Sequence, residues 1–306
     1  RFPQQLSCAL LSCMISSSAL PSQPPKSALA RARALEPPKP SAVYGGEDEG
    51  SDFWDTHAPL LAEALKELGP LNPSAYNPSA PQIFTPEVAE ALRAKRSGNL
   101  TSMVQGTEVP GVYKLQLLNP EFCRILIKEL EHIRASGIPT RRPNGMNRYG
   151  AILGELGFQP LLTLLRTQIV MPIAKALYPD MLRDPELEEE YGFTVRYEHG
   201  GDLELAEHAD ASCITMNVCL GHEDPGFEGG DLLFRGVRFL EQDASKKEQQ
   251  AITHELGTAL IHLGQHLHQA SPIEAGVREN LILWVFGNGG YVRIKPYDSK
   301  YIEAEL

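Results

Sequence analysis

The chain has 306 residues, of which 28 are basic and 39 acidic, so its formal net charge is −11 and neither nucleic acid nor an anionic membrane is an expected partner. Apolar residues make up 42% and charged residues 22%, as in globular proteins, and no uninterrupted apolar run reaches the roughly 18 residues of a membrane span. The five cysteines are scattered and form no C-x-x-C pair, which argues against a disulfide scaffold or a structural zinc site.

The N-terminal part predicts little ordered structure. Residues 1–53 are expected to be a disordered or targeting tail, because they are rich in proline and poor in apolar residues. The weakly apolar stretch 7–20, followed by basic residues, resembles a targeting remnant, so the compartment stays open between a targeted one and the cytoplasm. Residues 54–110 should hold linker and short helices, over 55–68 and 86–97.

The next part, 111–190, is expected to be a helical support region. Residues 112–118 predict a strand. A helix should begin at Asn119 and be capped by Gly137, since its apolar residues recur at helical spacing.

A second long amphipathic helix is expected over 160–178. It should be distorted at Pro172, because proline cannot donate a backbone hydrogen bond. The acidic run 184–190 that follows should be solvated.

From residue 191 the hydrophobic period shortens. Short strands separated by turns rich in glycine, proline and aspartate predict a double-sheet β-roll or barrel over 191–290, with the preceding helices buttressing one sheet and a C-terminal extension over 291–306. The expected strands lie at about 193–198, 212–220, 231–234, 258–263 and 281–286.

Histidines carry the chemistry of this part, since no P-loop, dinucleotide-binding or nucleophile-elbow motif occurs. His208 and Asp210 form an H-x-D step, and on an extended segment residues i and i+2 face the same side. A second histidine from a distant strand would complete the two-histidine, one-carboxylate set of non-haem Fe(II) oxygenases. A second H-x-D copy at 222–224 lies in an expected surface turn and is the weaker candidate.

The remaining metal ligand should come from a downstream cluster that contains His262, His266 and His268. A turn over 272–276 should fold the chain back and bring Arg278 onto the neighbouring strand, near the metal. A guanidinium there could grip a carboxylate with two parallel hydrogen bonds. A co-substrate that chelates metal at one end and is anionic at the other, such as 2-oxoglutarate, fits this arrangement.

Residues 193–286 resemble the catalytic domain of the 2-oxoglutarate- and Fe(II)-dependent dioxygenases, in the prolyl and lysyl hydroxylase branch. The motifs are Val195-Arg-Tyr197, His208-Ala-Asp210-Ala-Ser, Phe227-Glu-Gly-Gly230, Gly257-Thr-Ala-Leu260, His268-x-x-x-Pro272-x-x-x-Gly276-x-Arg278 and Leu283-Trp284. The upstream stretch 119–178, with Arg142-Pro-Asn144-x-Met146-Asn147, is similar to the helical support of proteins named only as 2-oxoglutarate and iron-dependent oxygenase domain-containing.

The resemblance implies an α+β fold with a double-stranded β-helix (jelly-roll, cupin-like) core. It implies an Fe(II)-dependent dioxygenase that uses O₂ and 2-oxoglutarate, releases succinate and CO₂, and is supported by L-ascorbate. The implied metal ligands are His208, Asp210 and His268, and the implied co-substrate contacts are Arg278, Tyr197 and Asn217. No catalytic residue beyond these ligands is expected.

Three functions stay open. The resemblance favours hydroxylation of a peptidyl side chain of the prolyl or lysyl type. The alternatives are a small-molecule hydroxylase on the same fold and a non-catalytic metal- or protein-binding module. Segments 138–158 and 221–230 are candidates to face the substrate. His262 and His266 are expected to be structural, and for Asn217 a plain hydrogen bond at a strand end is the competing interpretation.

Overall fold

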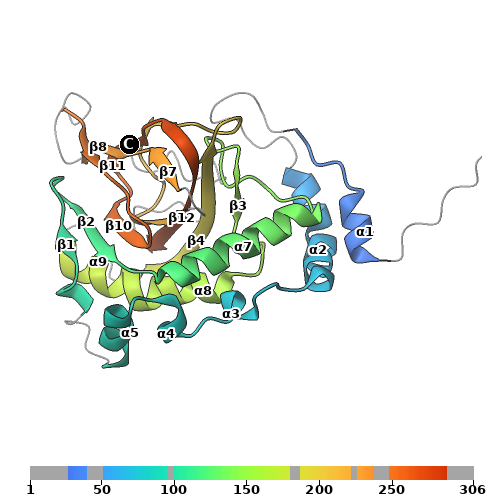
Figure 1. The fold of residues 1–306 in the computed structure, drawn as a ribbon, viewed down its shortest axis with the longest axis horizontal. Helices are drawn as coiled ribbons and strands as arrows, with labels where there is room; N and C mark the ends of the chain where they lie inside the picture. The colour runs from blue at the N-terminus through green and yellow to red at the C-terminus, as the bar shows by residue number, and fades with distance from the viewer. Residues whose placement is uncertain are drawn as a thin grey trace, which may run out of the picture.

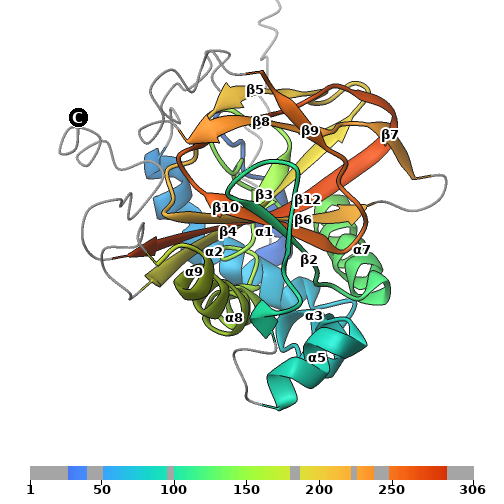
Figure 2. The ribbon, with the colours of Figure 1, turned by 90° about the vertical axis from the view of Figure 1, so that its left-hand side faces the viewer.

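Two antiparallel sheets face each other in the computed structural model, and helices cover the outer face of the larger sheet (Figures 1 and 2). The structure describes residues 27–39, 51–94, 100–179, 187–221, 226–237 and 248–287. No helix within these ranges is both long and apolar enough to cross a membrane. The helices are α1 (Ala28–Arg33), α2 (Ser51–Leu68), α3 (Pro73–Tyr76), α4 (Ala80–Ile83), α5 (Pro86–Arg93), α7 (Pro120–Ser136), α8 (Gln159–Leu165), the π-helical turn η1 (Arg166–Val170) and α9 (Met171–Leu177).

The larger sheet has the strand order β1-β2-β10-β6-β12-β4-β3, and β7 pairs with β12 off this path. Its strands are β1 (Gln105–Gly106), β2 (Val112–Gln116), β3 (Gly150–Ile152), β4 (Leu187–Glu198), β6 (Ile214–Gly221), β7 (Phe227–Gly229), β10 (Thr258–Leu263) and β12 (Ile273–Gly287). The smaller sheet has the order β5-β11-β8-β9. Its strands are β5 (Leu205–His208), β8 (Leu232–Val237), β9 (Gln250–Ile252) and β11 (His266–Ala270).

The main strands of the core alternate between the two sheets, while the short strands β7 and β9 each follow a strand of their own sheet. The chain passes from β4 in the larger sheet to β5 in the smaller one, returns for β6, and continues with β8, β10, β11 and β12 on alternating sides. This winding is that of a double-stranded β-helix, so the predicted α+β jelly-roll is confirmed. The larger sheet also takes in β1, β2 and β3, which precede the segment where the sequence analysis placed the core.

The strand β12 shows how the larger sheet separates two apolar layers. Its side chains alternate between the faces, as the pleat of a strand requires. The helix-facing members are Leu281, Leu283 and Val285, and the members that face the smaller sheet are Ile282, Trp284 and Phe286. The interior between the sheets is therefore lined by every second residue of this strand.

Both predicted long helices are present. In α7, the Asn119 side chain accepts a hydrogen bond from Glu121 N, and Gly137 ends the helix at φ 77°, a left-handed conformation that glycine adopts without a Cβ clash. The second helix is broken into α8, the π turn and α9, with Pro172 directly after the π turn. The predicted distortion at this proline is confirmed.

Two expectations about the flanking segments are wrong. The stretch 27–39 is not unstructured, because α1 buries Ala28 and Ala32 against α2, and Arg33 Nε donates to the carbonyl oxygen of Ser136 at 2.6 Å. The end of the acidic run is not solvated either. Glu190 lies in β4 and forms a largely buried ion pair with Arg166 of η1.

Buried glutamates hold the helical layer together. Glu279 of β12 is fully buried on the helix-facing side of the sheet, where Arg134 of α7 binds both of its carboxylate oxygens and Arg196 of β4 lies 3.6 Å away. Glu129 of α7 is also fully buried and anchors the segment 71–76. Its carboxylate accepts hydrogen bonds from the backbone N–H groups at 71 and 72 and from the hydroxyl at 76, at 2.8–3.0 Å.

We expect Glu129→Ala to lower the free energy of unfolding by about 3 kcal/mol, because it leaves three donors without their charged acceptor. Urea denaturation of the wild type and the variant measures this loss. Glu90→Ala is the matched control. Glu90 is exposed and, among the described residues, pairs with Arg93 one helical turn away, so its loss should cost less than about 0.5 kcal/mol. Equal effects of the two variants would contradict the anchoring role of Glu129.

Candidate metal centre

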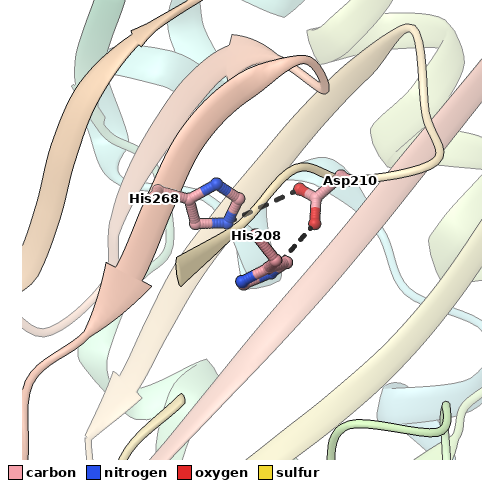
Figure 3. A group of neighbouring side chains, drawn as sticks. All are labelled: His208, Asp210 and His268. Atoms are coloured by element: carbon pink, nitrogen blue, oxygen red, sulfur yellow. Dashed lines mark ion pairs between the residues drawn. The ribbon is translucent and has the colours of Figure 1, made fainter. Parts of the chain in front are cut away.

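Two histidines and an aspartate converge inside the roll (Figure 3). His208 ends β5, Asp210 follows two residues later, and His268 lies opposite His208 on the paired strand β11. His208 Nε2 is 3.4 Å from Asp210 Oδ1, and His268 Nε2 is 3.7 Å from Asp210 Oδ2. The ligand atoms all lie within 4.8 Å of one another, a spacing that one bound metal ion could bridge.

Backbone carbonyls fix the orientation of both imidazole rings. Nδ1 of His208 lies 2.8 Å from the carbonyl oxygen of Ala206, and Nδ1 of His268 lies 2.8 Å from that of His266. A carbonyl can only accept, so each Nδ1 carries the proton and donates. Each Nε2 therefore presents its lone pair to the centre, as in metal sites whose histidines are oriented by a second hydrogen bond.

Asp210 is held by its own surroundings. The carboxylate is 4% exposed, and the hydroxyl of Thr215 on β6 donates to its Oδ2 at 2.5 Å. Burial opposes the ionisation of this carboxyl, but the imidazoles of His268 and His208 outweigh it and hold its pKa well below its usual range. The centre thus offers two neutral nitrogen donors and an anionic oxygen donor, a set that suits Fe(II).

The two histidines of the centre differ in their affinity for protons. Burial disfavours the charged form of His208, but its hydrogen bond to Asp210 and the charge of that carboxylate more than compensate, so the pKa of His208 is raised. Burial lowers the pKa of His268 to about 4, although Asp210 opposes this shift. In the absence of metal, His208 therefore takes up a proton at a higher pH than His268 does.

The neighbouring histidines are placed around the centre and not in it. His262 is buried with its ring 4.8 Å from that of His268, and burial lowers its pKa to about 3. His266 is buried and has Nε2 3.3 Å from the carbonyl oxygen of Pro110. Neither belongs to the group of potential ligands. The second H-x-D copy, at 222–224, lies outside the described residues.

Arg278 lies on the inner face of β12 and is 1% exposed. Within the described residues, its Nε and Nη1 atoms are buried without a hydrogen-bond partner, and its guanidinium stacks over the ring of Tyr197 at 4.8 Å from the ring centroid. Gly230 leaves room for it, because a Cβ there would lie 2.9 Å from Arg278 Nη1. A buried guanidinium with unsatisfied donors fits an anionic ligand such as a carboxylate.

The expected route that brings Arg278 to the site is wrong. Arg278 does not lie on the strand beside His268, since β11 pairs with β5 and β8, whereas β12 pairs with β4, β6 and β7. The chain crosses from the smaller to the larger sheet between His268 and Arg278. The two residues therefore face each other across the interior.

All six residues that the sequence analysis named as metal ligands or co-substrate contacts line a single cavity. Its lining includes His208, Asp210, His268, Arg278, Tyr197 and Asn217, together with Asn144, Asn147, Thr215, Asn280 and Trp284. A larger cavity, with Arg142 and Arg196 in its lining, lies on the opposite side of β4 from the Tyr197 side chain. The metal-ligating group is in the smaller cavity, so we place the chemistry there.

Asn217 belongs to a chain of hydrogen bonds beside Arg278. His254 Nε2 donates to the carbonyl oxygen of Thr258 at 2.9 Å, so its Nδ1 must accept from Asn280 Nδ2 at 3.2 Å. The same Asn280 amide donates to Asn217 Oδ1 at 2.7 Å. Asn217 is therefore near the expected co-substrate pocket, but its carbonyl oxygen already has a protein partner.

Sequence reasoning missed several residues of this cavity. Thr215 and Asn280 could have been found, because each lies two positions from a predicted residue on the same strand face, Asn217 and Arg278 respectively. Asn144 and Asn147 were noted as part of a motif, and the segment 138–158 that contains them was named as a candidate to face the substrate. Nothing in strand periodicity indicates that this loop reaches the metal centre.

Comparison with known proteins identifies relatives of the chain. Residues 65–183 match the family model described as OGFOD2-like domain. The 2-oxoglutarate and iron-dependent oxygenase domain-containing protein 2 of Mus musculus is 33% identical over 238 residues, which cover 73% of this chain and 66% of that protein. The first curated relatives are matched over 54–66% of their own length, so the chain spans about half to two thirds of them.

Two further proteins are similar over shorter or more divergent stretches. The multifunctional procollagen lysine hydroxylase and glycosyltransferase LH3 of Rattus norvegicus is 30% identical over 186 residues, covering 58% of this chain and 23% of that protein. Among solved structures, a prolyl-4-hydroxylase of Pseudomonas putida aligns with a TM-score of 0.40 at 16% identity, covering 68% of this chain and 98% of that one.

We expect the affinity for a divalent metal to fall as the pH is lowered, because the metal competes with a proton for Nε2 of His208. The raised pKa of His208 places the onset above its usual 6.5, and the association constant should then fall roughly tenfold per pH unit. His268, with a pKa of about 4, adds nothing until strongly acidic pH. Calorimetry with Mn(II) between about pH 8 and 5 measures this, and a flat profile would contradict it.

Proposed function

Because the chain belongs to the family of 2-oxoglutarate and iron-dependent oxygenase domain-containing proteins, we propose that it is an Fe(II)- and 2-oxoglutarate-dependent dioxygenase. The observation that carries this proposal is a pair of opposite buried charges in one cavity. Asp210 lies between two imidazoles that offer Nε2 atoms, and Arg278 has donors without a partner. The first end suits a divalent metal and the second end suits a carboxylate.

His208, Asp210 and His268 would hold the iron. The bound iron supplies the activation of O₂ that couples conversion of 2-oxoglutarate to succinate and CO₂ with hydroxylation of a substrate. The protein keeps the three ligands in place before metal arrives, through Thr215 and through the carbonyls that orient the imidazoles. The burial of Asp210 and His268 keeps bulk water away from this end of the cavity.

Arg278 would bind the distal carboxylate of 2-oxoglutarate. Tyr197 supports it from β4 by stacking its ring on the guanidinium, and the adjacent backbone at Gly230 leaves the approach open. Asn217 acts through Asn280, whose amide it holds from the neighbouring strand. This division of roles explains why a cationic side chain is buried at the end of the cavity with no acidic partner among the residues that the structure describes.

The proposed prime substrate is a peptidyl side chain of the prolyl or lysyl type. The support for it is the similarity to a protein named as a procollagen lysine hydroxylase. L-Ascorbate is proposed as the reductant that keeps the iron in its ferrous form. A non-catalytic binding module would not need a metal-ligating group and an unpartnered arginine in the same cavity.

The direct test is succinate formation from 2-oxoglutarate by the purified protein under air, with Fe(II) and ascorbate. We expect slow turnover by the wild type and none by His208→Ala, because that variant lacks one of the three metal ligands. Absence of turnover in the wild type, together with no metal-dependent binding of 2-oxoglutarate in calorimetry, would contradict the proposal.

Arg278→Gln should raise the KM for 2-oxoglutarate by at least about thirtyfold, because it removes the charged half of a buried carboxylate pair. Arg278→Lys should not restore the wild-type value, since a lysine cannot form two parallel hydrogen bonds. Arg124→Gln is the control, as Arg124 is exposed on α7 and its ion pair within the described residues is with Glu121. Similar KM values in Arg278→Gln and in the control would show that the co-substrate binds elsewhere.

A further inference from the structure

Asn147 brings a buried hydrogen-bond donor to the metal cavity from outside both sheets. Its side chain is 2% exposed and lines the same cavity as the metal-ligating group, and its Nδ2 has no hydrogen-bond partner in the described part of the chain. A buried amide N–H₂ without an acceptor costs free energy unless a ligand satisfies it. Asn147 belongs to the loop between α7 and β3, so it is not part of the frame that holds the metal ligands.

The neighbouring Asn144 fixes which atom of Asn147 is free. Asn144 Oδ1 accepts from the backbone N–H groups of Met146 and Asn147, each at 2.8 Å, so this atom must be the oxygen. The nitrogen of the same amide then donates to Asn147 Oδ1 at 3.0 Å. Asn147 Oδ1 is therefore occupied, and its Nδ2 is the atom left for a ligand.

The loop that carries Asn147 is tied down on both sides. The hydroxyl of Tyr191 on β4 donates to the carbonyl oxygen of Pro143 at 2.5 Å. Beyond Asn147, the carboxylate of Asp202 accepts from the backbone N–H groups of Arg148 and Tyr149 at 2.7 and 3.2 Å. These hydrogen bonds hold the loop around Asn147 in place. Binding of a ligand by Asn147 therefore costs little conformational entropy of the loop.

The chemistry of the cavity indicates what this donor binds. The anionic ends of 2-oxoglutarate are matched by the metal centre and by the cationic Arg278, whereas an amide N–H₂ is neutral and suits a neutral acceptor. The carbonyl oxygen of a peptide bond is such an acceptor. We propose that Asn147 binds the prime substrate by donating from Nδ2 to a main-chain carbonyl of a peptide, an inference that rests on the proposed dioxygenase function.

Asn147→Asp is the first variant: it keeps the acceptor for Asn144 and removes the free donor, but it also adds a negative charge to the cavity. Asn147→Leu, which introduces no charge that could pair with Arg278, is the second variant. The probe is a pool of short synthetic peptides with a central lysine or proline between randomised residues. Succinate is measured with and without the pool, and the gain of one oxygen atom by the peptides is measured by mass spectrometry.

The expected result is that the ratio of peptide-stimulated to peptide-independent succinate formation falls about tenfold in both variants, the effect of losing one hydrogen bond to the substrate. Tyr149→Phe is the control and should keep the wild-type ratio, as its ring is exposed on the same loop. If the ratio of peptide-stimulated to peptide-independent succinate formation is unchanged in both Asn147 variants, the inference is overturned. This holds whether the two rates of succinate formation are both lowered or both unchanged.

The same experiment separates this inference from the function on which it rests. A wild type that converts 2-oxoglutarate but is not stimulated by the peptide pool would overturn the peptide as substrate, and Asn147 as its ligand, while leaving the dioxygenase intact. A wild type that converts no 2-oxoglutarate with or without peptides would overturn the dioxygenase itself.

Discussion

The centre of this protein is organised by two opposite charges that are buried in one cavity and do not pair with each other. Asp210 is surrounded by imidazoles and a hydroxyl, and Arg278 by aromatic rings. Isolated charges in a protein interior are expensive unless a partner arrives. Asp210 is therefore stabilised by a bound cation and Arg278 by a bound anion. A single molecule that chelates the cation at one end and carries a carboxylate at the other end supplies both contacts.

The alternation of the main core strands between two sheets places these charges. His208 and His268 come from the smaller sheet, and Arg278 and Tyr197 from the larger one. The helices pack on the opposite face of the larger sheet, where they bury the side chains that point away from the cavity. The cavity is therefore lined from three parts of the chain: the smaller sheet, the larger sheet and the loop that carries Asn147.

Much of this arrangement could be predicted from the sequence, because spacing along a strand is local information. The H-x-D step, the helix between Asn119 and Gly137 and the distortion at Pro172 depend on a few adjacent residues, and the structure has each of them. The sheet that Arg278 joins was predicted wrongly, since periodicity shows that a strand exists but not which strands it pairs with. The helix α1 was missed because its buried face is made of alanines, which add little to hydrophobicity.

Arg278 and Glu279 are adjacent on β12, fully or almost fully buried, and directed to opposite faces of the sheet. A slip of this strand by one residue would carry the carboxylate into the cavity and the guanidinium into the helical layer, where Arg134 and Arg196 already lie. Both positions would then be electrostatically mismatched at once. The adjacent opposite charges of Arg278 and Glu279 therefore favour the observed register of β12 over one shifted by a single residue.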